Sequence, residues 1–267
     1  MDQNLIAVIV GIVEGLTEFL PVSSTGHMII VGHLLGFEGQ LADVFDVFVQ
    51  LGAILSVIFI YKERFIRFFT KDGWDVNKGL SVWHVAAGIV PVMGVAFFLY
   101  KYIKLYLFSP LTVAIGLFLG GVLLIIAEKY TEGKEDQLVN DVDKISLKQA
   151  IWVGIYQFLS LWPGFSRSGS TIAGGLLVGL SRECAAAYTF LIAVPLMFVA
   201  CLYDLYKNFK YLNAGDLQVL GIGFVVSFIV AYLSVLWFLK FLKNSKLTSF
   251  AIYRMALALF TFWYFYR

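Results

Sequence analysis

Two short polar segments interrupt apolar stretches of this chain, and they contain the residues whose types could do chemistry. The first covers residues 14–27 and the second covers residues 162–171. A charged side chain inside an apolar segment is costly, so it is usually retained for a function. The functional residues of the protein are therefore expected in these two segments.

Glu14 and Glu18 lie four residues apart, so on a helix they share one face. Two neighbouring carboxylates repel each other unless a divalent metal ion joins them or one of them holds a proton. Either arrangement would make both glutamates functional, catalytic residues, and the two carboxylates could be the ligands of a metal ion. The alternative is that both side chains lie at a helix end near the membrane surface and face water.

Hydroxyl groups and an imidazole follow within about one turn, at Ser23, Ser24, Thr25 and His27. A hydroxyl beside a histidine is the arrangement of a nucleophile and its base. The same hydroxyl groups could also contact phosphate, and we expect this of Ser23 and Thr25. The alternative is that the hydroxyls only cap the helix that follows.

Arg167 is the most informative residue of the second segment, where Ser166, Ser168 and two glycines flank it. A guanidinium beside hydroxyl groups and a helix N-terminus makes a strong phosphate site. The alternative is a structural salt bridge from Arg167 to one of the two glutamates. Carboxylates, a hydroxyl with a histidine, and an arginine loop together indicate phosphoryl chemistry on a lipid-linked phosphate rather than ion conduction.

The composition is that of an integral membrane protein, because 60% of the residues are hydrophobic, 14% are charged and the mean hydropathy is +0.83. A spanning helix needs about 20 mostly apolar residues. Five stretches qualify clearly, at approximately 43–61, 84–103, 111–127, 184–203 and 217–239. A sixth stretch, 249–266, carries Arg254, which we expect to snorkel to the interface or to pair internally.

The apolar arm that follows each polar segment is too short to span the membrane, so we expect two re-entrant helical hairpins with polar loops. They superpose without a gap at an offset of 143 residues, which places Ser23 on Ser166 and Gly36 on Gly179. Three spans separate the hairpins, so the hairpins enter from opposite faces as an inverted-topology repeat. The prediction is an all-α membrane protein, a single domain over 1–267 with repeats over approximately 1–130 and 144–267.

The basic residues predict the orientation of the chain in the membrane. Residues 62–83, 129–148 and 240–248 carry twelve lysine or arginine residues, and the segments on the opposite side carry five. The richer side is expected to be cytoplasmic, which places both termini on the outer, periplasmic side. The basic residues do not gather on a shared face, so we expect no nucleic-acid partner.

The two segments closely resemble the signature motifs of the undecaprenyl pyrophosphate phosphatase, or bacitracin resistance protein, family, and the resemblance extends over essentially the whole chain. The motifs are Glu14-Gly-Leu-Thr-Glu18-Phe-Leu-Pro-Val-Ser-Ser-Thr-Gly-His27 and Pro163-Gly-Phe-Ser-Arg167-Ser-Gly-Ser-Thr171. The resemblance implies hydrolysis of undecaprenyl diphosphate to the monophosphate in the bacterial inner membrane, with a divalent metal such as Mg or Ca. This reaction recycles the lipid carrier of cell-wall synthesis and gives bacitracin resistance.

By motif, the resemblance makes Glu14 and Glu18 the acidic pair, and Ser24 and His27 the catalytic loop. It also implies a phosphate-binding loop of Ser166, Arg167, Ser168 and Thr171.

The expected mechanism has Arg167 holding the diphosphate while Ser24 attacks with His27 as its base. His27 or water as the attacking group remains open, and so does a lipid-carrier flippase or transporter, because inverted repeats with broken helices also occur in transporters. The expected partners are a polyprenyl diphosphate and membrane lipids, and a homodimer is left open.

Overall fold

The computed structural model describes residues 2–107, 109–208 and 214–267, and the regular secondary structure of this described part is helical apart from an isolated bridge between Val139 and Leu180. The fold is therefore all-α, as predicted. The α-helices are α1 Gln3–Thr17, α2 Ser24–Leu35, α3 Gln40–Ile60, α4 Lys62–Phe68, α5 Val82–Tyr106, α6 Pro110–Thr131, α7 Leu147–Tyr156, α8 Arg167–Leu177, α9 Arg182–Asn208, α10 Ala214–Leu242 and α11 Thr248–Tyr266. The 3₁₀ helices are η1 Lys71–Trp74, η2 Val76–Lys78, η3 Glu135–Gln137, η4 Val142–Lys144 and η5 Gln157–Leu161.

Five helices of the described residues are long and apolar enough to cross a membrane, which confirms the five clearest predicted spans. The sixth predicted span, α11, is a helix but is not apolar enough to be counted with them. The spans are Leu41–Ile60, Val82–Leu99, Pro110–Thr131, Arg182–Lys207 and Asp216–Leu242.

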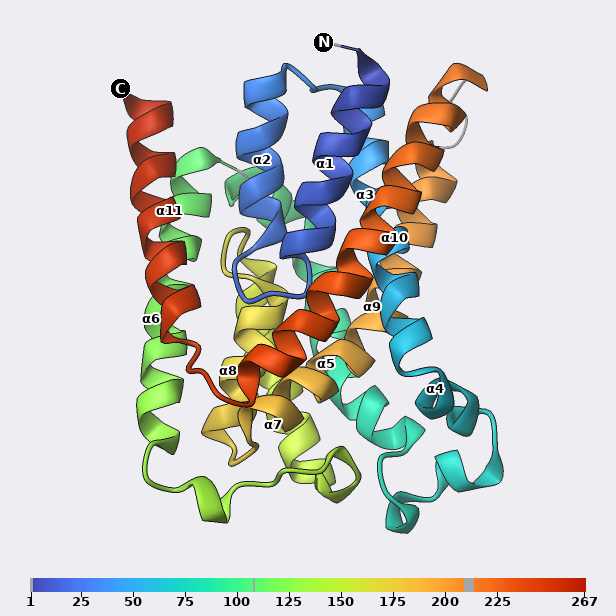
Figure 1. Ribbon diagram of the computed structural model, residues 1–267, viewed down its shortest axis with the longest axis vertical. Coiled ribbons are helices and arrows are strands. Elements are labelled where there is room, and N and C mark those ends of the chain that lie inside the picture. The colour runs from blue at the N-terminus through green and yellow to red at the C-terminus, as the bar shows by residue number, and fades with distance from the viewer. Residues whose placement is uncertain (1, 108, 209–213) are drawn as a thin grey trace.

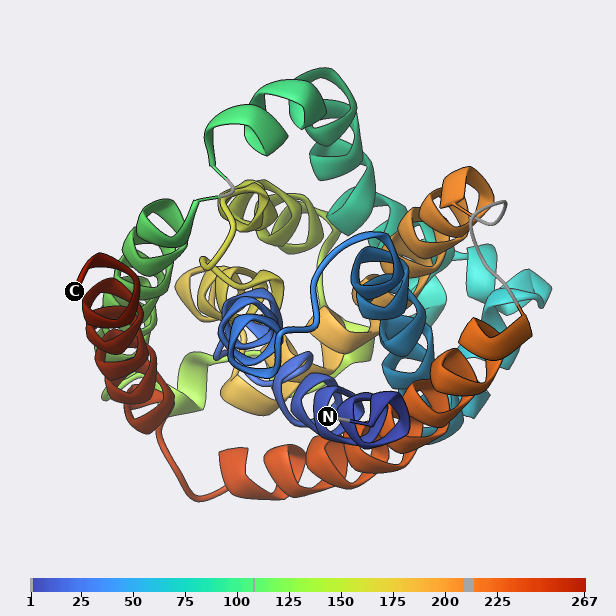
Figure 2. The same cartoon turned by 90° about the horizontal axis from the view of Figure 1, so that it is seen from above.

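Two helical hairpins enter the bundle from opposite ends, and their loops meet near its middle (Figure 1). The first hairpin is α1 followed by α2, and the second is α7, continued by η5, followed by α8. Seen from above, α2 and α8 lie inside a ring formed by the longer helices (Figure 2). The predicted pair of opposed hairpins is therefore confirmed.

The two hairpin loops share an unusual backbone conformation. Ser23 and Ser166 are the only non-glycine residues of the described chain with positive φ, at 71° and 72°. Each accepts a hydrogen bond from a backbone amide three residues later, so each caps the helix that follows. Gly36 and Gly179, also 143 residues apart, have positive φ after the same two helices. These features repeat at the predicted offset.

The first helix of each hairpin packs against a span from the other half of the chain. Helix α1 runs along α10, and α7 packs on α5. The approach is close, because a methyl group on Gly11 would lie 2.9 Å from the Gly223 carbonyl oxygen of α10, and one on Gly154 would lie 2.7 Å from that of Ala87 in α5. The division into repeats over 1–130 and 144–267 stays a prediction.

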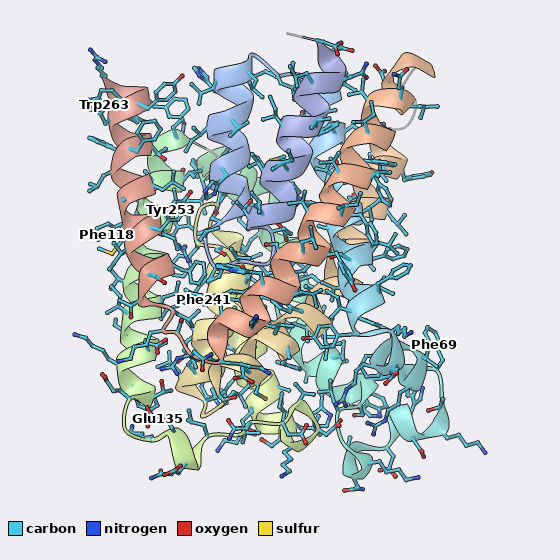
Figure 3. The ribbon with its side chains drawn as sticks, viewed as in Figure 1. Phe69, Phe118, Glu135, Phe241, Tyr253 and Trp263 are labelled. Atoms are coloured by element: carbon cyan, nitrogen blue, oxygen red, sulfur yellow. The ribbon has the colours of Figure 1, made fainter. Side chains whose placement is uncertain are left out.

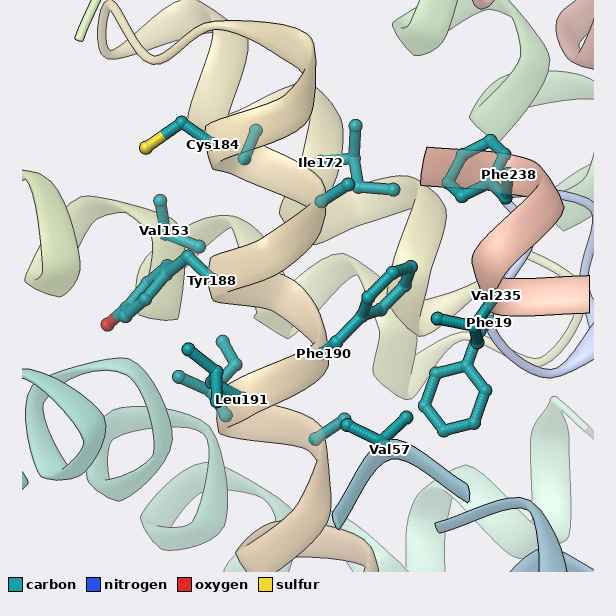
Figure 4. Close-up of a cluster of buried hydrophobic side chains, with 14 of the residues drawn as sticks. Phe19, Val57, Val153, Ile172, Cys184, Tyr188, Phe190, Leu191, Val235 and Phe238 are labelled. Atoms are coloured by element: carbon teal, nitrogen blue, oxygen red, sulfur yellow. The ribbon is translucent and has the colours of Figure 1, made fainter. Parts of the chain in front are cut away.

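The hydrophobic core surrounds α9 and supports the first loop (Figure 4). Phe19, next to Glu18 in the chain, is fully buried and packs edge-on against Phe190 of α9, with ring centroids 5.4 Å apart. Phe190 packs in turn against Phe238 of α10. The core therefore holds the backbone that presents Glu18.

Candidate functional site

A cavity of about 190 Å³ lies where the two loops meet. The first loop contributes Glu18 and residues 23–25 to its lining, and the second contributes residues 162–164, Ser166 and Arg167. Most of the predicted site residues therefore share one cavity. The volume is below the roughly 300–1,000 Å³ of pockets that enclose drug-sized ligands, so the cavity suits a headgroup rather than a whole lipid.

Glu18 is the residue on which both hairpins converge. Arg167 donates from Nη2 to Glu18 Oε1 at 2.9 Å, and the Ser24 hydroxyl donates to Glu18 Oε2. Ser24 and Arg167 are the first residues of α2 and α8 and are 143 positions apart. Equivalent positions of the two hairpins thus hold one carboxylate, of which only 8% is exposed.

Arg167 forms the salt bridge to a glutamate that was the alternative to a phosphate site, but this salt bridge leaves part of the guanidinium free. Its Nη1 atom is buried and has no hydrogen-bond partner within the described protein. The side chain is 13% exposed and lines the cavity. Arg167 can therefore hold Glu18 and still donate to a phosphate oxygen in the cavity.

The other hydroxyl residues of the second loop are bonded within the protein. Ser168 donates to the Leu20 carbonyl oxygen of the first loop at 2.8 Å, and Thr171 donates to the Arg167 carbonyl oxygen at 2.8 Å. Neither is among the residues that line the cavity. In this structure they join and support the two loops, while Ser166 lines the cavity and caps α8.

In the first loop, Ser23 is buried and caps α2, and Thr25 is exposed and lines the cavity. The capping alternative thus holds for Ser23. Ser24 lies between them and binds Glu18, so the hydroxyls of this loop have different environments.

Glu14 lies one turn before Glu18 and is only 1% exposed, which excludes the alternative of a surface carboxylate facing water. Its Oε1 atom has no hydrogen-bond partner within the described protein. A buried oxygen without a donor is unfavourable, so the Glu14 carboxyl requires a proton, a water or a cation.

A divalent metal ion fits this donor set only if the substrate shares in binding it. Among the described residues, no three His, Cys, Asp or Glu side chains are close enough to hold a metal ion. Mg²⁺ is usually bound by one or two carboxylates together with waters and substrate phosphates. Two glutamates, one with an unpartnered oxygen, meet that requirement.

Both ring nitrogens of His27 are hydrogen-bonded to residues other than Ser24. Its Nδ1 lies 2.8 Å from the Ser23 carbonyl oxygen and its Nε2 lies 2.7 Å from the Tyr253 hydroxyl. A carbonyl oxygen only accepts, so Nδ1 donates, and in the neutral ring Nε2 accepts from Tyr253. The expected hydrogen bond between Ser24 and His27 is therefore replaced by one between Ser24 and Glu18.

His27 instead faces a second, apolar groove of about 750 Å³ on the side of α10 and α11. Tyr253 and Phe241 line this groove between the two helices (Figure 3). Leu20 and Val22 of the first loop line it too, whereas Glu18 and Ser24 line the small cavity. The first loop thus presents different side chains to two different spaces.

Arg254 is the site residue whose role sequence reasoning missed. It is fully buried and binds backbone carbonyls of both loops, so the expectation of snorkelling was wrong and that of internal pairing was correct. A charge at the centre of an apolar stretch was the only signal. Tyr253, the partner of His27, gave none.

Apolar spans around two opposed hairpins, with carboxylates, a hydroxyl and an arginine where the loops meet, define a multi-pass helical membrane protein with a buried site suited to phosphate. The chain belongs to the family described as bacitracin resistance protein BacA, whose family model matches residues 7–260.

Curated relatives named as undecaprenyl-diphosphatases match nearly the full chain. The undecaprenyl-diphosphatase of Solidesulfovibrio magneticus is 47% identical over 266 residues, which cover 98% of this chain and 99% of the relative. Undecaprenyl-diphosphatase 1 of Bacillus cereus is 45% identical over 260 residues, which cover 97% of each chain. A protein of the same name from Bacillus thuringiensis strain Al Hakam is also 45% identical, with the same coverage.

Proposed function

We propose that this protein hydrolyses undecaprenyl diphosphate to undecaprenyl phosphate and inorganic phosphate, which recycles the lipid carrier of cell-wall synthesis and gives bacitracin resistance. The observation that carries the proposal is the convergence of Ser24 and Arg167 on Glu18 beside a cavity of headgroup size. The names of relatives that match nearly the whole chain support the choice of substrate.

Arg167 binds the diphosphate in this proposal. Its unpartnered Nη1 donates to a phosphate oxygen, and the N-terminus of α8, which begins at this residue, favours negative charge at the same place. Thr25 and Ser166 line the same cavity and offer hydroxyl groups.

Ser24 is the proposed nucleophile and Glu18 its base. The Ser24 Oγ bond to the terminal phosphorus forms while the bond from that phosphorus to the bridging oxygen breaks, and the proton passes to Glu18 Oε2. Undecaprenyl phosphate leaves, and water then hydrolyses the phosphoserine. His27 is less suited to attack, because both of its nitrogens are bonded and it faces the apolar groove.

Glu14 and Glu18 would hold a divalent metal ion such as Mg or Ca. Such an ion, when bound, would neutralise charge on the diphosphate. Glu14 is the better placed of the two to accept a cation, because Arg167 and Ser24 already occupy both oxygens of Glu18. Chelation is therefore expected to lower activity.

Phosphate release from undecaprenyl diphosphate by the purified protein in detergent tests the reaction. Wild type should release phosphate and form a phosphoenzyme, and Ser24→Ala should do neither. Ser160→Ala is a matched control, because Ser160 lines the same cavity but its hydroxyl donates to the backbone carbonyl oxygen of Gln157. A phosphoenzyme that persists in Ser24→Ala and maps to His27 would refute the serine mechanism.

A lipid flippase, the alternative, has no support in the names of the relatives. Detergent separates the two functions because no membrane remains to be crossed. No phosphate release in the presence of metal, together with lipid movement in vesicles, would replace the proposed hydrolysis with transport.

We also propose that the protein lies in the bacterial inner membrane, among its lipids, with both termini outside. The termini lie at one end of the bundle, and the basic segments 62–83, 129–148 and 240–248 lie at the other (Figure 1).

Cysteine labelling tests this topology. Cys184 and Cys201 are buried, so a cysteine introduced at Lys134 can be labelled selectively. It should react with an impermeant thiol reagent only after cells are opened, and reaction in intact cells would reverse the topology. A homodimer stays a prediction.

A further inference from the structure

Arg254 of α11 is fully buried, and its charge is not met by a carboxylate. None of the ion pairs in the described part of the chain includes it. The guanidinium instead donates to three backbone carbonyl oxygens: Pro21 at 3.3 Å, Gly164 at 3.1 Å and Phe165 at 2.6 Å. A buried charge is costly, so its place among loop carbonyls calls for a specific role.

The carbonyls that Arg254 binds belong to both loops, and two of the three occupy equivalent positions in them. Pro21 and Gly164 are 143 residues apart, and each lies two residues before the serine that caps the following helix. Nη1 holds the first loop and Nη2 holds the second. One rigid guanidinium therefore sets the separation of the two loops just before Ser24 and Arg167.

Two glycines make room for this guanidinium. A methyl group on Gly120 of α6 would overlap Nη2 of Arg254, and one on Gly169 of α8 would overlap Nη1. The surrounding helices thus admit the arginine head in one place and prevent it from moving sideways. The arrangement is preorganised rather than a loose contact of a long side chain.

We propose that Arg254 is a positioning residue, which fixes the register of the two loops and thereby the contact of Arg167 with Glu18. It touches neither side chain through a hydrogen bond of its own and acts only through the loop backbones. The inference rests on the proposed function, because the register matters only if Arg167, Glu18 and Ser24 act together.

Phosphate release by purified variants tests this role, with each rate expressed per folded protein from gel filtration and thermal unfolding. Arg254→Gln should lower kcat on the order of 100-fold, the effect of misplacing reacting groups by about 1 Å. Arg254→Lys should lower kcat less than Arg254→Gln does, because the ammonium group keeps the charge. It should still be slower than wild type, because one ammonium group cannot reach both loops with two parallel donors.

A glycine pair on α6 supplies a matched control that leaves Arg254 itself unchanged. Gly120→Ala displaces the guanidinium, and its methyl group also lies 2.7 Å from the Phe165 carbonyl oxygen that the guanidinium binds, so it should lower kcat too. Gly121→Ala disturbs the same pair of helices, where its methyl group meets the Met255 side chain at 2.8 Å and the Ala251 carbonyl oxygen at 3.0 Å. None of these atoms belongs to Arg254 or to the loops, so kcat should stay close to wild type. If Arg254→Gln does not fold, Arg254→Lys and the two glycine variants together decide the question.

A double-mutant cycle separates positioning from general stabilisation. If Arg254 acts by placing Arg167, Arg254→Gln combined with Arg167→Lys should be little slower than the slower single variant, because both remove one interaction. Losses that multiply would overturn the proposal, and so would folded Arg254→Gln and Gly120→Ala proteins with wild-type kcat. Wild-type activity in Arg167→Lys alone would instead refute the proposed site, and this inference with it.

Discussion

Glu18 holds a hydroxyl on one carboxylate oxygen and a guanidinium on the other, so a single side chain connects the proposed nucleophile to the proposed phosphate clamp. The Ser24 hydroxyl already donates to this carboxylate, which places Glu18 to accept the proton of Ser24. Glu14, one turn earlier, lacks such a partner on Oε1. Two glutamates on one helix face therefore have different roles.

Ser166 and Ser23 combine a side-chain cap with a backbone conformation that side chains rarely adopt. Such strain costs about 1–3 kcal/mol and is found at functional sites. It aims the first residues of α2 and α8, Ser24 and Arg167, at the carboxylate between the two loops.

Exchanging Ser166 tests the strain directly. Ser166→Gly removes the cap but suits positive φ, whereas Ser166→Ala removes the cap and keeps the strain. The glycine variant should therefore be more stable than the alanine variant by about 1–3 kcal/mol. Reversible unfolding in mixed micelles measures this difference.

The matched control is Ser56, in the interior of α3, where the alanine variant should be more stable than the glycine variant. Its hydroxyl bonds a backbone carbonyl within the same helix, and glycine costs about 1 kcal/mol relative to alanine at such a position. Equal stability of Ser166→Gly and Ser166→Ala would contradict strain at this loop.

At the scale of elements, the loops at the basic end are tied together by Asp143. The carboxylate accepts from Arg64 at 2.5 Å, from Arg67 at 3.2 Å and from the Leu80 amide at 2.8 Å, so α4, η4 and the segment just before α5 meet there. Burial alone would raise the pKa of Asp143, but the hydrogen bonds from Arg64 and Leu80 and the two guanidinium charges outweigh it and hold the pKa below its usual value.

Replacing this carboxylate should lower stability in a pH-dependent way. Because the folded pKa is depressed, the stabilisation by Asp143 is complete above the unfolded pKa of about 3.9 and is lost as pH falls through the folded pKa. Asp143→Asn should therefore cost about 1–3 kcal/mol near pH 7 and progressively less below about pH 4. Thermal unfolding at both ends of this range measures the change.

Asp72→Asn removes an exposed carboxylate that pairs with Lys78 in the same region, and it should leave stability unchanged. A stability loss in Asp143→Asn that stayed constant down to pH 3 would show that the charge of Asp143 is not what ties these loops.

Local sequence was enough to predict the hairpins, because a proline and capping serines interrupt apolar stretches in each. The offset of 143 also paired Ser23 with Ser166 correctly. The partners of the site residues could not be predicted in the same way. Tyr253 is 226 positions from His27, and such contacts depend on how the helices pack, not on spacing along the chain.

The helical spacing of Ser24 and His27 suggested a pair that the structure does not form. His27 points to the groove beside α10 and α11, while Ser24 turns to the carboxylate of the preceding helix. The loop between α1 and α2 bends back on itself, so the Ser24 hydroxyl bonds a residue six positions earlier rather than one three positions later. Helical periodicity does not predict such a reversal of the chain direction.

In the whole molecule, the site exists only because two hairpins enter from opposite ends and meet. The ring of spans supports them through exchanged packing, with α1 on α10 and α7 on α5. Neither half of the chain contains both the acidic residues and the arginine, so each hairpin alone would lack one component of phosphoryl chemistry.

Phosphate release from undecaprenyl diphosphate by Arg167→Ala and Glu18→Ala tests this joint site most directly. The matched control is Arg182→Ala, which breaks another arginine–glutamate pair, formed with the buried Glu128. It should lower stability without slowing the reaction per folded molecule. The account predicts that each site variant loses at least about 100-fold in rate. Full activity in folded Arg167→Ala and Glu18→Ala proteins would contradict it.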